Sequence, residues 1–265
     1  MAAPARRCDA ERQSWQRRCK GLDENRPPCT RATTRRLMGV TSKPLAIVAG
    51  AGAGLGQSLL ARFEAGGFAP VGLGRSEPDA VVGAFHTLDL TDETRVADVI
   101  AAVIKEHGAP KVVIHNAAEL IIAPFPETHL KDYQTTWSSM VQSAILLAQA
   151  TIQPMVRAGG GAFIVSGATA SLRGGAKFSA FASAKFALRG FTQSLAREYQ
   201  PAGVHVCHTI LDGIINTQRS RDLHAMDPAK MMRPEDIAEA YWQLAHQPKS
   251  TWTHELDLRP ASEGF

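Results

Sequence analysis

Residues 45–56 read LAIVAGAGAGLG, a run of five apolar residues that passes directly into a glycine-rich turn. Five consecutive apolar residues suit a strand buried on both faces, as in a parallel sheet. After the turn, Leu55, Leu59 and Phe63 recur at four-residue spacing, the apolar stripe of a helix packed on that sheet. The stretch therefore predicts a strand, a turn and a helix in immediate succession.

The turn itself has the composition of a phosphate-binding site. At a helix N-terminus, free N–H groups and the positive end of the helix dipole face an anion. Glycines allow the backbone to approach the ligand, because a Cβ would occupy its space. The spacing here is Gly50-x3-Gly54-x-Gly56, which differs from the usual Gly-x-Gly-x-x-Gly dinucleotide fingerprint. A strand–helix turn without a ligand is the alternative interpretation of this stretch taken alone.

The excess positive charge of the chain is confined to its N-terminal segment. The net charge is +4, yet residues 1–43 contain 11 Lys and Arg against 4 Asp and Glu. The rest of the chain is mildly acidic, so the composition predicts no nucleic-acid partner. No apolar run reaches the ~18 residues of a membrane span, so we predict no membrane association. The length fits one large α/β domain at residues 44–265 preceded by this segment.

Residues 1–43 show no helical or strand period. Their three cysteines match no zinc-binding spacing, and no metal site is predicted. An Arg-rich organelle transit peptide is one interpretation, but four acidic residues and few serines count against it. We predict a disordered basic tail. A mis-assigned start is the alternative, since Met38 stands seven residues before the first strand. The only other thiol, Cys207, falls in an apolar strand, which favours a reducing, cytoplasmic compartment.

Apolar runs and helical stripes alternate along the rest of the chain. Strands are predicted at residues 45–49, 68–73, 84–88, 111–115, 162–165, 204–211 and 252–258, and helices at about 55–65, 92–108, 131–157, 179–199 and from 234 onward. This alternation predicts an α/β fold with a single doubly wound, Rossmann-type parallel sheet and helices on both faces. Pro154 is expected to kink or end the long helix. Residues 213–232 lack a strong period and are predicted to form a mobile lid.

Two loops at the ends of predicted strands suggest a dinucleotide cofactor. In such folds the loop after the second strand carries an acid for the NAD ribose or a basic group for the NADP 2′-phosphate. Here the residue is Arg75, which favours NADP(H) over NAD(H); a solvated loop arginine is the alternative. Asn116-Ala117-Ala118 follows another strand at the edge where ligands bind, and its small residues leave room for an adenosine.

The order of these motifs resembles the short-chain dehydrogenase/reductase family over nearly all of residues 44–258. The glycine turn looks like the family's cofactor turn, Asp89-Leu90 like its adenine contact, and Asn116-Ala117-Ala118 like its Asn-Ala-Gly motif. Asp212-Gly213, with Thr217 four residues later, takes the place of its Pro-Gly and following Thr. The resemblance implies these cofactor-binding residues: Gly50, Ala53, Gly54, Leu55, Gly56, Arg75, Asp89, Leu90, Asn116, Ala117, Ala118, Lys185, Gly213, Ile215 and Thr217.

The family's chemistry depends on a Tyr-x3-Lys pair, a Ser thirteen residues before the Tyr and an Asn in the long helix. The resemblance implies that the Lys holds the nicotinamide ribose and lowers the pKa of the Tyr, while the Ser polarises the substrate oxygen. In this chain Lys185 is retained as the catalytic lysine, with a surface lysine as the alternative. Phe181, Ala168 and Met140 occupy the Tyr, Ser and Asn positions. None of the chain's three tyrosines is followed by a lysine four residues later.

Two functions remain compatible with this pattern. The first is an NADP(H)-dependent oxidoreductase that transfers hydride to or from a small organic substrate with atypical proton chemistry. Four hydroxyls flank the missing positions and are candidates to polarise a carbonyl, although each is equally a loop hydrogen bonder: Ser166, Thr169, Ser171 and Ser179. The second is a non-catalytic NADP(H)-binding protein acting as a redox sensor or structural partner.

We favour the oxidoreductase, because Arg75, Lys185 and Thr217 make most sense around a bound cofactor. The family resemblance also implies a homodimer or homotetramer. The alanines of helix 179–199 would allow a second copy to approach closely, or would pack on the sheet of their own chain.

Overall fold

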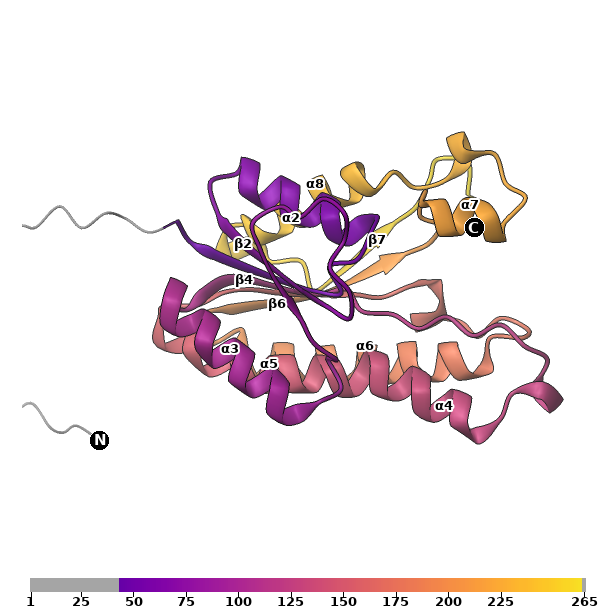
Figure 1. The fold of residues 1–265 in the computed structure, drawn as a ribbon, viewed down its shortest axis with the longest axis horizontal. Helices are drawn as coiled ribbons and strands as arrows, with labels where there is room; N and C mark the ends of the chain where they lie inside the picture. The colour runs from indigo at the N-terminus through magenta and orange to yellow at the C-terminus, as the bar shows by residue number, and fades with distance from the viewer. Residues whose placement is uncertain (1–42, 264–265) are drawn as a thin grey trace, which may run out of the picture. The chain divides into compact units, whose positions relative to one another are not determined.

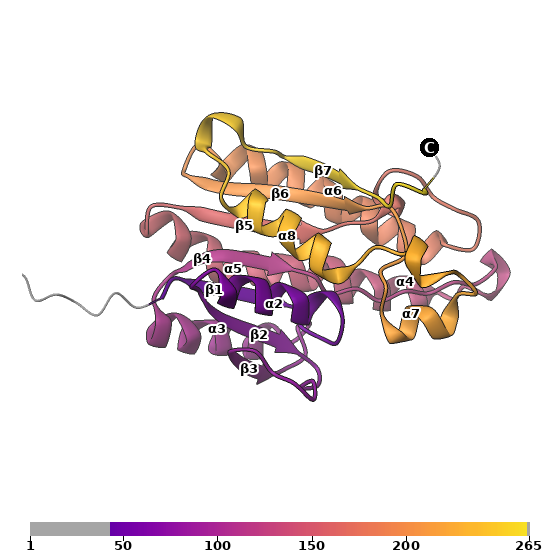
Figure 2. The same ribbon diagram turned by 90° about the horizontal axis from the view of Figure 1, so that it is seen from above.

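The apolar run at the start of the described chain is strand β1 (Leu45–Ala49), and each of its residues is buried. This computed structural model describes residues 43–263, and Figure 1 shows their fold. Strand β1 lies between β2 and β4 in a parallel sheet (Figure 2). The other strands are β2 (Ala69–Gly74), β3 (Ala84–Thr87), β4 (Pro110–His115), β5 (Gly161–Ser166), β6 (Val204–Leu211) and β7 (Glu255–Leu258). Their order is β3-β2-β1-β4-β5-β6-β7, and all neighbours pair in parallel. The predicted Rossmann-type sheet is confirmed.

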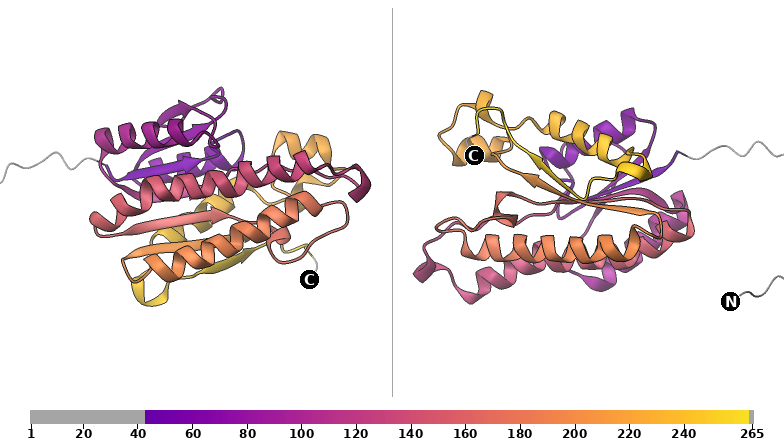
Figure 3. Two further views of the ribbon diagram at one scale, coloured as in Figure 1. Left: turned by 90° about the horizontal axis from the view of Figure 1, so that it is seen from below. Right: turned by 180° about the vertical axis from the view of Figure 1, so that it is seen from behind.

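Helices cover both faces of the sheet (Figures 1 and 3). On one face lie α2 (Leu55–Ala65) and α8 (Pro234–Ala245), packed on alternate residues of β1 such as Ala46 and Val48. On the other face lie α3 (Glu93–His107), α5 (Ser143–Arg157) and α6 (Ser179–Tyr199). Because both faces are covered, β1 has no solvent-facing residue, which explains its uninterrupted apolar sequence.

The chain runs from β1 to β2 and β3 on one side and then crosses back to β4 on the other side of β1. The direction in which strands are added therefore switches between β1 and β4. In doubly wound sheets ligands bind at such a switch point, beyond the carboxyl ends of the strands. Gly50 makes the turn with a φ of 84° and donates its N–H to the Leu73 carbonyl (2.9 Å). A Cβ at Gly50 would lie 2.5 Å from the Ala117 nitrogen, so glycine is required there.

The long helix predicted over residues 131–157 is divided into three parts. Helix α4 (Leu130–Trp137) is followed by a π-helical turn (Ser138–Gln142) and then by α5. The π turn has backbone hydrogen bonds between residues five apart, one more than in an α-helix. No residue type in the sequence predicts it. Pro154 does not end α5, which continues to Arg157. The proline falls in the last turn, where it disturbs little of the helix.

Residues 213–232 contain more regular structure than their sequence predicts. They include the short helix α7 (Gln218–Leu223) and a bridge between Ile215 and Met232. The Thr217 hydroxyl caps α7 by accepting the Ser220 N–H (3.1 Å). Six helical residues are too few to produce a detectable period. That this segment acts as a lid remains a prediction.

The tail predicted at residues 1–43 lies outside the described residues, except for Lys43. Over residues 43–263, no helix has the length and apolar character needed to cross a bilayer. Ala180 and Ala184 of α6 are buried inside the body, whereas Ala187 is only partly buried. That the protein forms a homodimer or homotetramer remains a prediction.

Candidate functional site

A cavity of about 730 Å³ lies at the carboxyl ends of β1, β4, β5 and β6. It extends from the glycine turn to α6 and α7. Twelve of the residues singled out from the sequence line it: Gly50, Ala53, Leu55, Gly56, Asn116, Ala118, Ala168, Phe181, Lys185, Gly213, Ile215 and Thr217. The predicted cofactor positions and the predicted catalytic positions therefore share one space.

Six of the predicted cofactor-binding and catalytic residues do not line this cavity. Gly54 borders an adjacent cavity of about 600 Å³ that it shares with Ala53 and Thr217. The other five are Arg75, Asp89, Leu90, Ala117 and Met140, none of which appears in the lining. Leu90 and Met140 are buried in the core beneath α3 and α5, and Ala117 packs against the same core. Met140 is fully buried in the π turn, so no side chain at this position reaches the cavity.

Arg75 and Asp89 lie near the β2–β3 edge of the sheet. Arg75 directly follows β2, and its largely exposed guanidinium lies 3.5 Å from the Glu119 carboxylate. The Asp89 carboxylate accepts the Thr91 N–H (2.9 Å) and the Thr91 hydroxyl (2.8 Å). These two hydrogen bonds hold the pKa of Asp89 below its usual value, and the nearby Arg75 charge adds to the effect. Asp89 is therefore an anionic acceptor held by Thr91, and the exposed Arg75 cation lies close to it.

The glycine turn leaves unused donors at the N-terminus of α2. Gly54 is the N-cap residue and supplies no side-chain cap, so the first helical N–H groups face outward without one. A Cβ on Gly52 would meet nothing within 4 Å, which means that open space lies beside the turn. A Cβ on Gly54 would lie 2.6 Å from a Thr217 methyl carbon, so the segment before α7 rests on the turn. Donors and space together fit a phosphate group.

Lys185 comes from the first half of α6 and is buried, with 2% of its surface exposed. Its Nζ donates a hydrogen bond to the main-chain oxygen of Ser166 (2.8 Å). Burial lowers the pKa of Lys185 to about 8. The Phe181 ring centroid lies 5.6 Å from Nζ, one helical turn earlier. The alternative that Lys185 is a solvated surface lysine is wrong.

Ser166 belongs to a buried network that connects the sheet with the glycine turn. Its hydroxyl donates to Asn116 Oδ1 (3.0 Å) and lies 2.7 Å from the Tyr241 hydroxyl. Asn116 Nδ2 in turn donates to the Gly50 carbonyl (3.1 Å). Asn116 thus holds the glycine turn in place. The Ser166 hydroxyl contacts two side chains of the protein, Asn116 and Tyr241.

The other three candidate hydroxyls have different surroundings. Ser171 is fully buried and lies 3.0 Å from His208 Nε2. Ser179 accepts a hydrogen bond from Tyr133 (2.8 Å). Thr169 donates to the Asp212 carboxylate. Of the four, Ser166 and Thr169 line the cavity.

Several lining residues carried no signal in the sequence. Apolar side chains from three separate segments surround the opening, namely Leu120, Phe178, Leu223 and Met226, and two of these segments also contribute Arg173 and Arg219. They sit in loops and in a short helix, where no periodic pattern marks the inward face. Within residues 43–263, no group of three or more His, Cys, Asp or Glu side chains is arranged to bind a metal ion.

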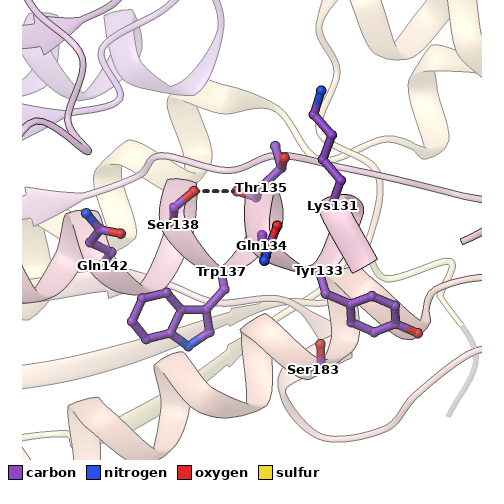
Figure 4. A pocket seen from close by; sticks show the side chains of 8 residues that line it. All are labelled: Lys131, Tyr133, Gln134, Thr135, Trp137, Ser138, Gln142 and Ser183. Atoms are coloured by element: carbon purple, nitrogen blue, oxygen red, sulfur yellow. Dashed lines mark hydrogen bonds between the residues drawn. The ribbon is translucent and has the colours of Figure 1, made fainter. Parts of the chain in front are cut away.

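A second hollow of about 680 Å³ lies on the outer side of α4 (Figure 4). Most of its lining residues belong to α4 and the π turn, including Tyr133 and Trp137, and Ser183 is contributed by α6. Ser138 donates there to the Thr135 carbonyl (3.2 Å). None of the predicted site residues lines this hollow.

Comparison with known proteins agrees with this geometry. The family model described as short chain dehydrogenase matches residues 44–228. A short-chain dehydrogenase/reductase from Armillaria gallica is 29% identical over 181 residues, covering 63% of this chain and 69% of the relative. An uncharacterized oxidoreductase of Staphylococcus aureus is 25% identical over 238 residues, covering 84% of this chain and 100% of the relative.

Solved structures show the same similarity. A short-chain dehydrogenase from Rhodopseudomonas palustris superposes with a TM-score of 0.69 at 32% identity, covering 82% of this chain and 98% of that chain. ElxO with NADP bound gives a TM-score of 0.75 at 19% identity, covering 82% and 97% of the two chains. The family match spans well over half of the chain. The protein therefore belongs to the short-chain dehydrogenase family and is an oxidoreductase of that type.

Proposed function

We propose that the protein is an NADP(H)-dependent oxidoreductase that transfers hydride to or from a small organic substrate. The observation that carries the proposal is the single cavity joining the glycine turn to Lys185. A dinucleotide spanning it would bring its pyrophosphate to the turn and its nicotinamide to α6. The bound cofactor would supply the hydride chemistry, and the apolar opening would receive the substrate.

The residues present fit such a cofactor. The free N–H groups before α2 and the open space at Gly52 suit a pyrophosphate. The buried Lys185 ammonium would donate to ribose hydroxyls, and Gly213, Ile215 and Thr217, which line the same cavity, would border the nicotinamide. Among the structural neighbours, ElxO binds NADPH in a variant in which phenylalanine replaces a tyrosine. In that neighbour a phenylalanine in place of a tyrosine is thus compatible with cofactor binding, which supports a bound cofactor here both for the oxidoreductase and for the alternative, a non-catalytic NADP(H)-binding protein.

Arg75 is our candidate for the residue that selects NADP(H). It follows β2, whose Leu73 carbonyl anchors the glycine turn, so it lies at the adenosine end of the proposed site. Its exposed ion pair with Glu119 is worth under about 1 kcal/mol and would be exchanged for the 2′-phosphate. A guanidinium–phosphate contact is charge-assisted and stronger.

The test is a fluorescence titration of the full chain with NADPH and with NADH. We expect NADPH to bind more tightly, and Arg75→Ala to weaken NADPH by about tenfold while NADH changes little. Arg197→Ala, which removes an exposed arginine at the far end of α6, is the matched control. Equal loss of both affinities, or tighter NADH binding by the parent protein, would show that Arg75 does not select the cofactor.

A further inference from the structure

Asp212 is a buried carboxylate in the wall of the cavity, with 6% of its surface exposed. It directly follows β6, and its N–H donates to the Leu258 carbonyl (2.8 Å), a bond that the proline of the family motif could not make. One carboxylate oxygen lies 3.0 Å from the Arg259 guanidinium. The other accepts the hydrogen bond from Thr169. Both oxygens are therefore held in place from two sides.

This arrangement determines what Thr169 offers to a ligand. A hydroxyl has one hydrogen and two lone pairs, and an ionised carboxylate has only acceptor sites. The Thr169 hydrogen is consequently committed to Asp212. Only a lone pair of Oγ1 is left for a hydrogen bond with a ligand in the cavity. Thr169 therefore acts there as an acceptor and not as a donor.

Thr169 follows Ala168, the position where the family resemblance implies a serine that polarises a carbonyl. Of the two hydroxyls near this position that line the cavity, Ser166 is buried between Asn116 and Tyr241, whereas Thr169 is only partly buried. Thr169 is thus the hydroxyl there that is more accessible to a ligand. A carbonyl oxygen needs a hydrogen-bond donor, whereas the Thr169 hydroxyl offers an acceptor.

We propose that Thr169, oriented by Asp212, accepts a hydrogen bond from a substrate hydroxyl, so that the cavity binds an alcohol in preference to the corresponding ketone. The inference rests on the proposed function, because an alcohol and its ketone are the two sides of a hydride-transfer reaction. It names the substrate class as hydroxyl-bearing compounds and assigns Asp212 as a positioning residue.

The proposal predicts an effect of the Asp212→Asn variant that a purely structural role of Asp212 would not produce. The Asn carbonyl oxygen must face Arg259, which only donates, so the Asn amide N–H₂ faces Thr169. That amide would donate to Oγ1 and release the Thr169 hydrogen toward the cavity. The preference for the alcohol should then be lost, because the alcohol and the ketone can each accept that hydrogen. Asp257→Asn is the matched control, since Asp257 pairs with the same Arg259 but does not line the cavity.

Cyclohexanol and cyclohexanone are suitable probes, because they have the same shape and differ in hydrogen-bond polarity. Their dissociation constants are measured by ligand-observed NMR on the full chain, first without cofactor and then with NADPH. We expect the parent protein to favour cyclohexanol by about fivefold, the size of one neutral hydrogen bond. Thr169→Ser should keep this preference, and Thr169→Val, which keeps the shape without the hydroxyl, should abolish it.

The inference is overturned if the parent shows no preference for cyclohexanol in either condition, including the case in which neither probe binds. It is also overturned if Thr169→Val keeps the preference, or if Asp212→Asn, still folded by its melting curve, keeps it too. These results do not depend on nucleotide selectivity. Failure of the cofactor titration with an intact alcohol preference would keep the role of Thr169 as an acceptor, and would remove the proposed function together with the assignment of the alcohol as a hydride-transfer substrate.

Discussion

The identity of residue 181 has the largest consequence at the scale of single residues. Phe181 lines the cavity beside Lys185, and its ring centroid lies 5.6 Å from the lysine Nζ. A hydroxyl on that ring would feel the lysine charge, which lowers the pKa of a phenol. Ala168, across the cavity, supplies no hydrogen bond to a substrate oxygen. Both positions therefore have to change before proton chemistry of the Tyr–Ser type can operate.

We predict that Phe181→Tyr combined with Ala168→Ser raises NADPH-dependent reduction of an activated ketone by more than the product of the two single effects. Groups that act as a unit are strongly non-additive, and a positioned acid contributes about 10²–10⁴ in rate. The measurement is the initial rate of NADPH oxidation with hexane-2,3-dione for the parent, both singles and the double. Lys185→Met in the double background is the control and should remove the gain.

A parent protein that already reduces the dione as fast as the double variant would mean that another proton donor is in place. A double variant that binds NADPH tightly but remains inactive would mean that the substrate is not held between residues 168 and 181. Either result contradicts the assignment of these two positions.

At the scale of elements, the strand–turn–helix unit of β1 and α2 carries two glycines with different duties. Gly50 has a φ of 84° and no room for a Cβ, because the Ala117 nitrogen would be 2.5 Å away. Gly52 has open space around it and lines the cavity. The first glycine is needed by the fold and the second by the ligand that we propose.

The paired variants Gly50→Ala and Gly52→Ala should separate these duties. We expect Gly50→Ala to lower the free energy of unfolding by more than about 1 kcal/mol through backbone strain and displacement of residues 116–117. Gly52→Ala should leave the melting temperature unchanged and weaken NADPH binding, because its Cβ projects into the space of the pyrophosphate. Thermal unfolding and NADPH titration of both variants provide the check. A Gly52→Ala protein with parental NADPH affinity would argue against a pyrophosphate at this turn.

At the scale of the whole molecule, two buried histidines link stability to pH. His115 lies 2.8 Å from the Ser143 hydroxyl, and His208 lies 3.0 Å from Ser171. Burial, with the nearby Lys185 charge, lowers the pKa of each to about 3. The folded protein keeps both rings neutral, whereas the unfolded chain protonates them near pH 6.5. Their contribution to stability is complete above pH 6.5 and is lost progressively as the pH falls toward 3.

We predict that the free energy of unfolding falls between pH 7 and pH 5 by about 2 kcal/mol for each of these histidines. Urea unfolding at the two pH values measures the difference. His115→Asn, which cannot be protonated, should reduce that difference by about 2 kcal/mol even if it lowers stability at both pH values. His129→Asn, at an exposed position, is the control. An unchanged pH difference in His115→Asn would show that His115 is not kept neutral by the fold.

Local sequence was sufficient wherever an element is defined by its own periodicity. The limits of α6 (Ser179–Tyr199) and β6 (Val204–Leu211) agree with their predicted ranges. The glycine turn, the parallel sheet and the family could likewise be predicted from short motifs in a fixed order. The π turn at Ser138–Gln142 and the helix α7 could not, since a hydrogen-bond shift and a six-residue helix leave no periodic trace.

The sequence by itself determined the α/β class, the doubly wound parallel sheet and the family. The cofactor turn and the absence of Tyr, Ser and Asn at three expected positions remain predictions from the sequence. Only the tertiary structure decided that Lys185 is buried and that Met140 points into the core. It also brought Thr169 to Asp212, 43 residues away in the chain. These two residues meet because β5 and β6 are neighbours in a parallel sheet, whose strands end at the same edge. Contacts of this kind depend on pairing between distant strands, and no local pattern in the sequence records them.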